Sequence, residues 1–220
     1  MMPLRVALTI DVEPDCPPFL WGFRGIEQGM PAFLDLLNDE RIPATCFTTG
    51  DVARRYPAVV ERIVADGHEL ACHGMSHRAF TLLDVSEAER EIEESAAVLR
   101  RFAKVASFRA PYLQFPSSYL PILERSDFVL DSSQAKYKVQ YYRERPATRL
   151  SRIPASVTSS VLRLPRPIRH AWLGALSDPV VLFVHPWEFV DLRRENLRLD
   201  CRFNTGSYAL DCLHDIIDFF

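Results

Sequence analysis

The sequence has no apolar run close to the roughly 20 residues that a membrane-spanning helix needs. Its first apolar stretch is too short for the core of a signal peptide and carries no cleavage signal. We therefore expect a cytoplasmic protein without stable membrane insertion. A strongly basic balance is also missing: the formal net charge is −3, which argues against a general nucleic-acid-binding protein.

Cysteine is scarce and scattered. The sequence has five cysteines, an odd number, and no two of them form a CxxC motif. We therefore expect buried reduced thiols rather than a disulfide framework or a zinc ribbon. The composition, 48% hydrophobic and 25% charged, is that of an ordinary globular protein. A chain of 220 residues buries roughly 70% of its unfolded surface, so its core needs no covalent or metal support. We predict a single domain over residues 1–220.

Strand and helix patterns alternate along the chain. Apolar runs that indicate buried strands lie at 6–10, 44–49, 69–72, 106–108, 128–130 and 180–184. Amphipathic periods predict helices within 30–37, 52–64, 88–99 and 206–220. Asp51 is the expected cap of the second helix, and Ser86 with Glu89 the capping box of the third. Such alternation with short connections is typical of a βα architecture with a largely parallel sheet.

The segment Tyr137–Trp172 shows no clean period and is rich in proline and arginine. We interpret it as an irregular insertion in the domain. Its arginines, from Arg143 to Arg169, have almost no acidic residues beside them in the sequence. Guanidinium groups match the geometry of phosphate, so these side chains could bind a phosphorylated substrate. A solvated basic surface or a mobile loop is the alternative interpretation.

Ionisable side chains follow the predicted strands, at the points where chemistry gathers in parallel βα folds. The strand ends carry Asp11 and Glu13; His73 and His77; Arg109, Pro111 and Tyr112; Asp131; and His185 and Trp187. One helical turn would place His73 and His77 on the same face. Two imidazoles and a carboxylate form a three-ligand metal site that leaves a position for water. Taken singly, each residue also has an ordinary role in packing, turns or salt bridges.

The order of these motifs resembles the polysaccharide deacetylase family, also called NodB-homology or carbohydrate esterase family 4 proteins. The likeness extends from Leu8 to His185. Its anchors are Thr9-Ile10-Asp11, His73-xxx-His77, Arg109-x-Pro111-Tyr112, Asp131 and His185. Residues 44–50 and 67–73 resemble the second and third strands of the family. The resemblance implies an α/β fold, a distorted (β/α) barrel of about seven strands.

The resemblance also implies roles for single residues. Asp11 matches the general base, and Arg109 matches the residue that orients it. His185 matches the general acid, with Asp131 as the carboxylate that tunes it. His73 and His77 match the metal-binding histidines. The residues Pro111, Tyr112 and Trp187 are the candidates for substrate binding.

The first motif departs from the family pattern. Many members have two adjacent aspartates there, the second of which binds metal, whereas this sequence has Val12. Some relatives carry an acidic residue one place later, and Glu13 fits that variant. We therefore take Glu13 as the third ligand of a divalent ion, with Zn²⁺ as the first choice and Co²⁺, Ni²⁺ or Mn²⁺ as the others. Two further interpretations stay open: Asp11 ligates the metal itself, or the protein works without metal.

The predicted function is a metal-dependent hydrolase that removes an N-acyl (acetyl) group from an amino sugar or glycan precursor. A cytoplasmic location favours a small, nucleotide-linked or lipid-linked amino sugar over an assembled wall polymer. We expect no nucleic-acid partner, and an oligomer stays open. One alternative is a C–N hydrolase of a cyclic imide or ureide on the same scaffold. The other is a non-catalytic binding module whose site has decayed.

Overall fold

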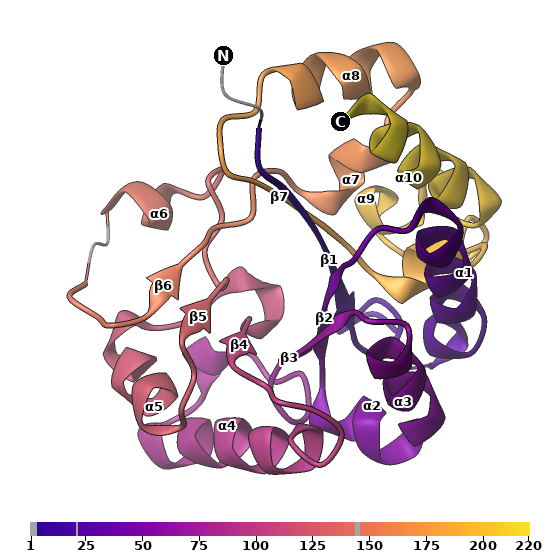
Figure 1. Cartoon of the computed structure of the whole chain (residues 1–220). Coiled ribbons are helices and arrows are strands. Elements are labelled where there is room, and N and C mark those ends of the chain that lie inside the picture. The colour runs from indigo at the N-terminus through magenta and orange to yellow at the C-terminus, as the bar shows by residue number, and fades with distance from the viewer. Residues whose placement is uncertain (1–3, 21, 144–145) are drawn as a thin grey trace.

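The core of the molecule is a parallel sheet of seven strands, which lies at the centre of Figure 1. The computed structural model describes residues 4–20, 22–143 and 146–220. The strands are β1 (Val6–Val12), β2 (Thr45–Thr48), β3 (Glu69–Cys72), β4 (Ser107–Phe108), β5 (Leu130–Asp131), β6 (Ser151–Arg152) and β7 (Val180–Val184). They lie in the order β6-β5-β4-β3-β2-β1-β7, and every neighbouring pair is parallel.

The sheet curls, so that its two edges approach each other. Ser156, just beyond β6, donates its backbone N–H to the carbonyl oxygen of Val181 in β7 at 2.8 Å. In return, the backbone N–H of Val181 donates to Oγ of Ser156 at 2.9 Å. The edges therefore meet through a loop rather than through a strand ladder. This arrangement confirms the predicted distorted (β/α) barrel of about seven strands.

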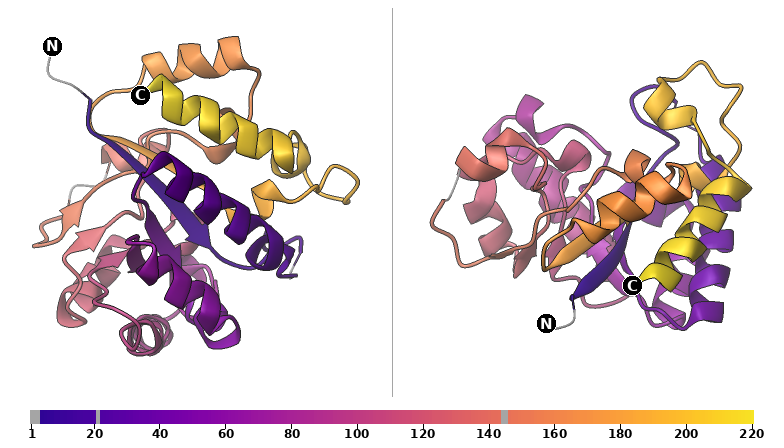
Figure 2. Two further views of the ribbon diagram at one scale, coloured as in Figure 1. Left: turned by 45° about the vertical axis from the view of Figure 1, so that its right-hand side comes forward. Right: turned by 90° about the horizontal axis from the view of Figure 1, so that it is seen from above.

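The helices lie outside the curled sheet (Figures 1 and 2). They are α1 (Met30–Glu40), α2 (Gly50–Arg55), α3 (Pro57–Ala65), α4 (Val85–Leu99), α5 (Leu120–Arg125), α6 (Val139–Arg143), α7 (Ser159–Leu162), α8 (Arg166–Gly174), α9 (Leu199–Arg202) and α10 (Ser207–Phe219). Helices α1 and α10 lie on the β1–β7 side, and α4 and α5 lie on the β3–β5 side. The longer helices turn an apolar stripe toward the sheet, as their amphipathic period predicts.

Strand β1 shows how the fold separates core from site. Its alternate residues point to opposite faces, because the side-chain period of a strand is two. Leu8, Ile10 and Val12 pack into the apolar cluster that also contains residues of α1. Thr9 and Asp11 point the other way and contact Arg109 in the interior of the barrel. The same strand therefore supplies both core packing and polar side chains to the interior.

One predicted helix is divided in the structure, and two of the predicted helix caps were wrong. The helix expected over 52–64 is two helices, because Tyr56 leaves helical geometry and Pro57 begins a new helix. Its N-terminal cap is Thr49, which stands in extended backbone and accepts a hydrogen bond from the N–H of Val52. On α4 the capping box is formed by Asp84 and Glu87 instead of Ser86 and Glu89.

The proline- and arginine-rich segment is part of the barrel, which corrects its interpretation as an irregular insertion. It contains α6, β6, α7 and most of α8, and β6 forms one edge of the sheet by pairing with β5. Its strand and two of its helices are only two to five residues long, too short to show a period in the sequence.

Four of its arginines form ion pairs with acids that are distant in the sequence: Arg152 pairs with Asp131, Arg163 with Glu188, and Arg166 and Arg169 with Asp215.

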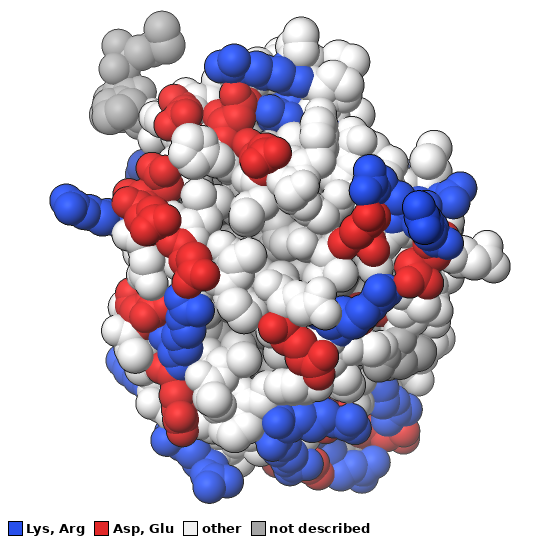
Figure 3. Space-filling view, turned by 90° about the vertical axis from the view of Figure 1, so that its right-hand side faces the viewer, with Lys and Arg blue, Asp and Glu red and all other residues white. Residues whose placement is uncertain are grey.

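Charges of both signs are mixed on the face that Figure 3 shows, which carries acidic side chains among the basic ones. Within the described residues, no helix is both long and apolar enough to pass through a membrane.

Candidate active site

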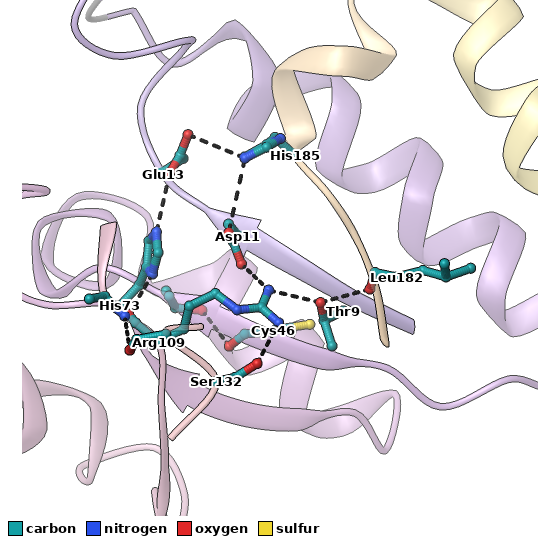
Figure 4. A network of polar contacts seen from close by, with 12 residues as sticks. Thr9, Asp11, Glu13, Cys46, His73, Arg109, Ser132, Leu182 and His185 are labelled. Atoms are coloured by element: carbon teal, nitrogen blue, oxygen red, sulfur yellow. Dashed lines mark hydrogen bonds and ion pairs between the residues drawn. The ribbon is translucent and has the colours of Figure 1, made fainter. Parts of the chain in front are cut away.

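The carboxyl ends of β1 and β7 open into a pocket of about 170 Å³. Six of the predicted site residues line it, namely Asp11, Glu13, His77, Tyr112, His185 and Trp187. The remaining wall comes from Cys16, Pro17, Leu113, Tyr137, Phe183 and Cys201, which the sequence did not single out. His73 and Arg109 lie beneath this pocket in the polar network that Figure 4 shows.

Glu13 lies between the two histidines of the HxxxH motif. Its Oε2 atom is 3.3 Å from Nε2 of His73 and 2.5 Å from Nε2 of His77. All three side chains are buried, and their candidate ligand atoms lie within 4.8 Å of one another. Burial raises the pKa of Glu13, but His77, His185 and His73 lower it, and the net pKa is well below the ordinary value. Glu13 is therefore an anion beside two imidazoles.

The hydrogen bonds around this trio fit a metal ion. Nδ1 of His73 donates to the carbonyl oxygen of Arg109 at 2.7 Å, which leaves the lone pair of Nε2 directed at Glu13. Within the described part of the chain, the ring nitrogens of His77 have no hydrogen-bond partner, despite the close approach of Glu13. Two imidazole nitrogens and a carboxylate that converge in this way are the donor set of a divalent ion such as Zn²⁺.

The turn that carries the two histidines is built by α4, not by a helix of its own. The prediction that one helical turn aligns His73 with His77 was wrong, since residues 73–77 are not helical and Gly74 and His77 have φ of +75° and +59°. Glu91 of α4 accepts the backbone N–H groups of Met75 and Ser76, both at 2.9 Å. Glu91 and Ser95 are polar residues on the otherwise apolar buried face of α4. This irregularity was the sequence signal for the contact, but the contact was not predicted.

Replacing Glu91 with alanine is expected to loosen the turn that carries His73 and His77. The N–H groups of buried Met75 and half-buried Ser76 would lose their carboxylate acceptor, at about 1.5–3 kcal/mol for each hydrogen bond to a charged group. We expect a lower melting temperature and zinc affinity reduced by about 10–100-fold. Isothermal titration of the apo protein measures the affinity. The control is Glu91→Gln, whose amide oxygen can still accept both bonds; equal zinc affinity in wild type and the alanine variant would contradict this role.

Arg109 holds Asp11 by one oxygen and leaves the other free. Nη1 of Arg109 donates to Oδ1 of Asp11 at 2.6 Å and to Oγ1 of Thr9 at 2.8 Å. The guanidinium also donates to Ser132 at 2.9 Å and lies 4.1 Å from the centre of the Phe47 ring. Arg109 is fully buried. The free Oδ2 of Asp11 faces Nε2 of His185 at 4.0 Å. Because Asp11 is bound to Arg109 and Glu13 lies between the histidines, Glu13 is the better candidate ligand.

His185 is oriented by Glu188. Its Nδ1 atom donates to Oε1 of Glu188 at 2.6 Å, and its ring stacks on Trp187 at 4.7 Å between centroids. Nε2 is left to face Asp11 and Glu13, at 4.0 and 3.9 Å. Burial lowers the pKa of His185, but Glu13, Glu188 and Asp11 raise it to about 9. The neighbouring carboxylates therefore favour the charged form of His185, whose Nε2 faces the pocket.

Asp131 does not contact His185, contrary to the predicted pair. Its Oδ2 atom accepts from Nε of Arg152 at 2.9 Å, and its Oδ1 atom accepts the backbone N–H of Ser133 at 2.9 Å. Both oxygens of the Asp131 carboxylate are thus occupied by groups of its own edge of the sheet. The sequence signal for Glu188 was its position three residues after His185, in the turn Pro186–Phe189.

The three predicted substrate-binding residues lie in different places. Tyr112 has φ of +61° and sets its ring edge-on against His77, with 4.8 Å between centroids. Trp187 donates its indole N–H to Oε1 of Glu13 at 3.2 Å. Both line the pocket, whereas Pro111 is buried and is not among the lining residues. Tyr112 and Trp187 are thus placed to contact a ligand, and Pro111 shapes the turn that presents Tyr112.

Sequence comparison finds relatives among glycan deacetylases. A family model described as "Polysaccharide deacetylase" matches residues 3–130, more than half of the chain. A chitooligosaccharide deacetylase from Sinorhizobium fredii is 38% identical over 85 residues, which are 37% of this chain and 40% of that protein. A peptidoglycan-N-acetylglucosamine deacetylase from Bacillus cereus is 28% identical over 128 residues, which are 57% of this chain and 42% of that protein. The match spans less than half the length of these relatives.

Structure comparison agrees on the fold. The family 4 carbohydrate esterase from Streptomyces lividans, solved in complex with acetate, superposes with a TM-score of 0.66 at 16% sequence identity. The superposition covers 98% of this chain and 86% of that one. The matching family model includes the residues that form the trio and the Asp11–Arg109 pair. The chain belongs to the polysaccharide deacetylase family.

Proposed function

We propose that this protein is a zinc-dependent hydrolase that removes the N-acetyl group from an amino sugar. One observation carries the proposal: the Glu13–His73–His77 trio lies beside Oδ2 of Asp11 and Nε2 of His185, and all of these residues except His73 line one small pocket. This arrangement holds the three functions that amide hydrolysis needs, namely a metal site, a base and an acid.

Glu13, His73 and His77 would hold the ion. A bound Zn²⁺-class ion lowers the pKa of water to about 7 and polarises a carbonyl oxygen. Asp11 is placed to take the proton of the attacking water, because Arg109 fixes one of its oxygens and the other faces the pocket. The guanidinium keeps this carboxylate in a single orientation, so it does not turn away when it accepts the proton.

His185 would give the proton that the departing nitrogen requires. An amine is a poor leaving group unless it is protonated, and a positioned acid contributes about 10²–10⁴-fold to such a step. Glu188 and Asp11 raise the pKa of His185 and so favour the charged imidazole that can give this proton. Glu188 occupies Nδ1, so the proton that can leave is the one on Nε2, which faces Asp11 and Glu13.

For the substrate we propose an N-acetylhexosamine in a short oligosaccharide or in a nucleotide- or lipid-linked precursor, met in the cytoplasm. The pocket of about 170 Å³ suits a single sugar residue, and a hollow of about 630 Å³ lies beside it, with Leu113 in the wall of both. Gln114, Gln134 and Gln140 line the larger hollow and offer amide groups to sugar hydroxyls. The names of the relatives support a glycan substrate.

The test measures acetate released by the zinc-loaded protein from N-acetylglucosamine oligomers, from a nucleotide-linked N-acetylhexosamine and from a hydantoin-type ring. We expect release from at least one sugar substrate, its loss after chelation, and its return when zinc is added back. Hydrolysis of the ring alone would favour the cyclic-imide alternative. A wild-type protein that binds no metal would favour a binding module.

Replacing Glu188 with glutamine is expected to move the alkaline limb of the rate profile to lower pH. His185 acts in its protonated form, so turnover falls as the pH rises through its pKa. Glu188 is one of the groups that raise this pKa, and removing an adjacent charge shifts a pKa by about 1–3 units. The profile of kcat against pH measures the shift. Glu89→Gln, which removes an exposed carboxylate paired with Arg125, is the control; superimposable profiles for all three proteins would refute the assignment.

A further inference from the structure

One buried arginine of the proline- and arginine-rich segment is linked to His185 through Glu188. Arg163 follows α7 and is only 2% exposed. Its guanidinium lies 3.0 Å from Oε2 of Glu188. The two oxygens of Glu188 are therefore divided: Oε1 accepts from His185, and Oε2 faces Arg163. Arg163, Glu188 and His185 form a continuous chain of charged groups that ends at the pocket.

The Nη atoms of the same guanidinium bind the backbone of α9, which contributes to the wall of the pocket. Nη2 of Arg163 donates to the carbonyl oxygen of Asp200 at 2.7 Å, and Nη1 donates to that of Phe203 at 2.6 Å. These carbonyls belong to α9 and its C-terminal end, and Cys201 of α9 lines the pocket. In addition, the Phe203 ring lies 5.0 Å from the guanidinium carbon. One side chain thus fixes both the carboxylate behind His185 and the wall near it.

We propose that Arg163 is a positioning residue for the deacetylation reaction, acting through Glu188 to fix the imidazole of His185. This inference rests on the proposed function. Without the guanidinium, Glu188 would be a buried carboxylate with His185 as its main cationic partner, and it would turn toward water or toward another donor. The imidazole hydrogen-bonded to it would turn as well. A misplacement of 1 Å at a catalytic group can cost about 10²-fold in rate.

A purely structural role is the competing explanation, and the chain offers a matched control. Arg169 comes from the same segment, is 3% exposed and forms a 2.5 Å ion pair with Asp215 of α10. It also donates to the carbonyl oxygen of Leu164 at 2.6 Å. Asp215 is not among the residues that line the pocket. Arg163→Met and Arg169→Met therefore each remove a buried guanidinium from an ion pair, and only the first of these pairs reaches His185.

The experiment is a double-mutant cycle on zinc-loaded protein, with acetate release from N-acetylglucosamine oligomers as the readout. We expect Arg163→Met to lower kcat by about 10–100-fold with little change in KM, and Arg169→Met to leave kcat near wild type. In a Glu188→Gln background, Arg163→Met should cost less than about 3-fold, because its route to His185 is already cut. Equal losses in both backgrounds, or a loss in Arg169→Met equal to that in Arg163→Met, would overturn the proposal.

A second variant and an NMR measurement test the role of Arg163 independently of the first variant's folding and of the substrate. If Arg163→Met does not fold, Arg163→Lys takes its place in the cycle, because the ammonium keeps the charge but has no planar fork for Glu188 and the carbonyls together. The low-field proton NMR signal of Nδ1–H of His185 needs no substrate. It should persist in Arg169→Met and shift or broaden in the Arg163 variant. An unchanged signal would count against Arg163 even if no sugar substrate were turned over, whereas wild-type protein without acetate release would count against the function alone.

Discussion

Replacing Asp11 with asparagine is expected to lower kcat for acetate release by about 10²–10⁴-fold, the usual contribution of a positioned base. Asparagine has nearly the same shape, and its amide oxygen can still accept the 2.6 Å hydrogen bond from Arg109. It cannot accept the proton of the attacking water. The ligand trio does not include Asp11, so zinc content should stay at the wild-type level. Steady-state rates and metal analysis of the same preparations measure both quantities.

Ser132→Ala is the control for this substitution. Ser132 accepts a hydrogen bond from Nη2 of Arg109 at 2.9 Å, so its loss disturbs the same buried network without removing a base. We expect a change in kcat of less than about 10-fold, because the substitution keeps the carboxylate of Asp11 and its hydrogen bond from Arg109. An asparagine variant with loss of zinc would instead make Asp11 a metal ligand, and one with wild-type turnover would remove it from the mechanism.

Replacing His185 with alanine is the second change with a large expected effect, again about 10²–10⁴-fold in kcat for an N-acetyl sugar. The imidazolium is needed because the leaving nitrogen must be protonated. An activated acetate ester with a phenolate leaving group needs no such proton. We therefore expect the alanine variant to lose much less activity on the ester than on the amide. The ratio of the two losses, measured on one preparation, separates acid catalysis from general damage.

His170 supplies the comparison for His185. It also lies next to a carboxylate, with Nε2 2.6 Å from Oδ2 of Asp215, but it belongs to α8, and Asp215 to α10. His170→Ala should leave both substrates at wild-type rates. If His185→Ala reduced amide and ester hydrolysis equally, His185 would be a structural or metal-site residue rather than the acid.

The fold and the strand ends could be predicted well from the sequence, because they depend on patterns of neighbouring residues along the chain. Strands such as Val180–Val184 are continuous apolar runs, because a parallel sheet covered by helices buries both faces of a strand. The ends of such runs can be read directly, and parallel strands bring their carboxyl ends to one side of the sheet. The strand pattern therefore predicts that Asp11, Arg109 and His185 share one site, and the structure places them together.

Contacts that depend on how the sheet curls could not be read in the same way. Asp131 is a strand-end carboxylate like Asp11, and the sequence does not say that Arg152 and the backbone N–H of Ser133 occupy its oxygens. Glu188 lies three residues from His185 and needs only a short turn to reach it. Glu188, which is close to His185 in the chain, was thus a better candidate for its partner than Asp131, which is distant in the chain.

The partners of the arginines in the segment 137–172 also could not be predicted from the sequence. These arginines stand without acids in the sequence, which suggested a free basic surface. In the structure, Arg163 and Arg169 are buried against Glu188 and Asp215, which come from the C-terminal part of the chain. Charge balance is settled by neighbours in space, and a window of sequence shows only neighbours along the chain. The phosphate-binding interpretation is correspondingly weaker for these two side chains.

The central claim is that Glu13, His73 and His77 hold the ion on which sugar deacetylation depends. The most direct test titrates the apo protein with zinc and follows metal binding and acetate release together, in wild type and in Glu13→Gln. We predict one zinc per wild-type chain, activity that rises in step with occupancy, and a glutamine variant that loses both. Full activity without metal, or zinc binding and turnover unchanged by Glu13→Gln, would contradict the claim.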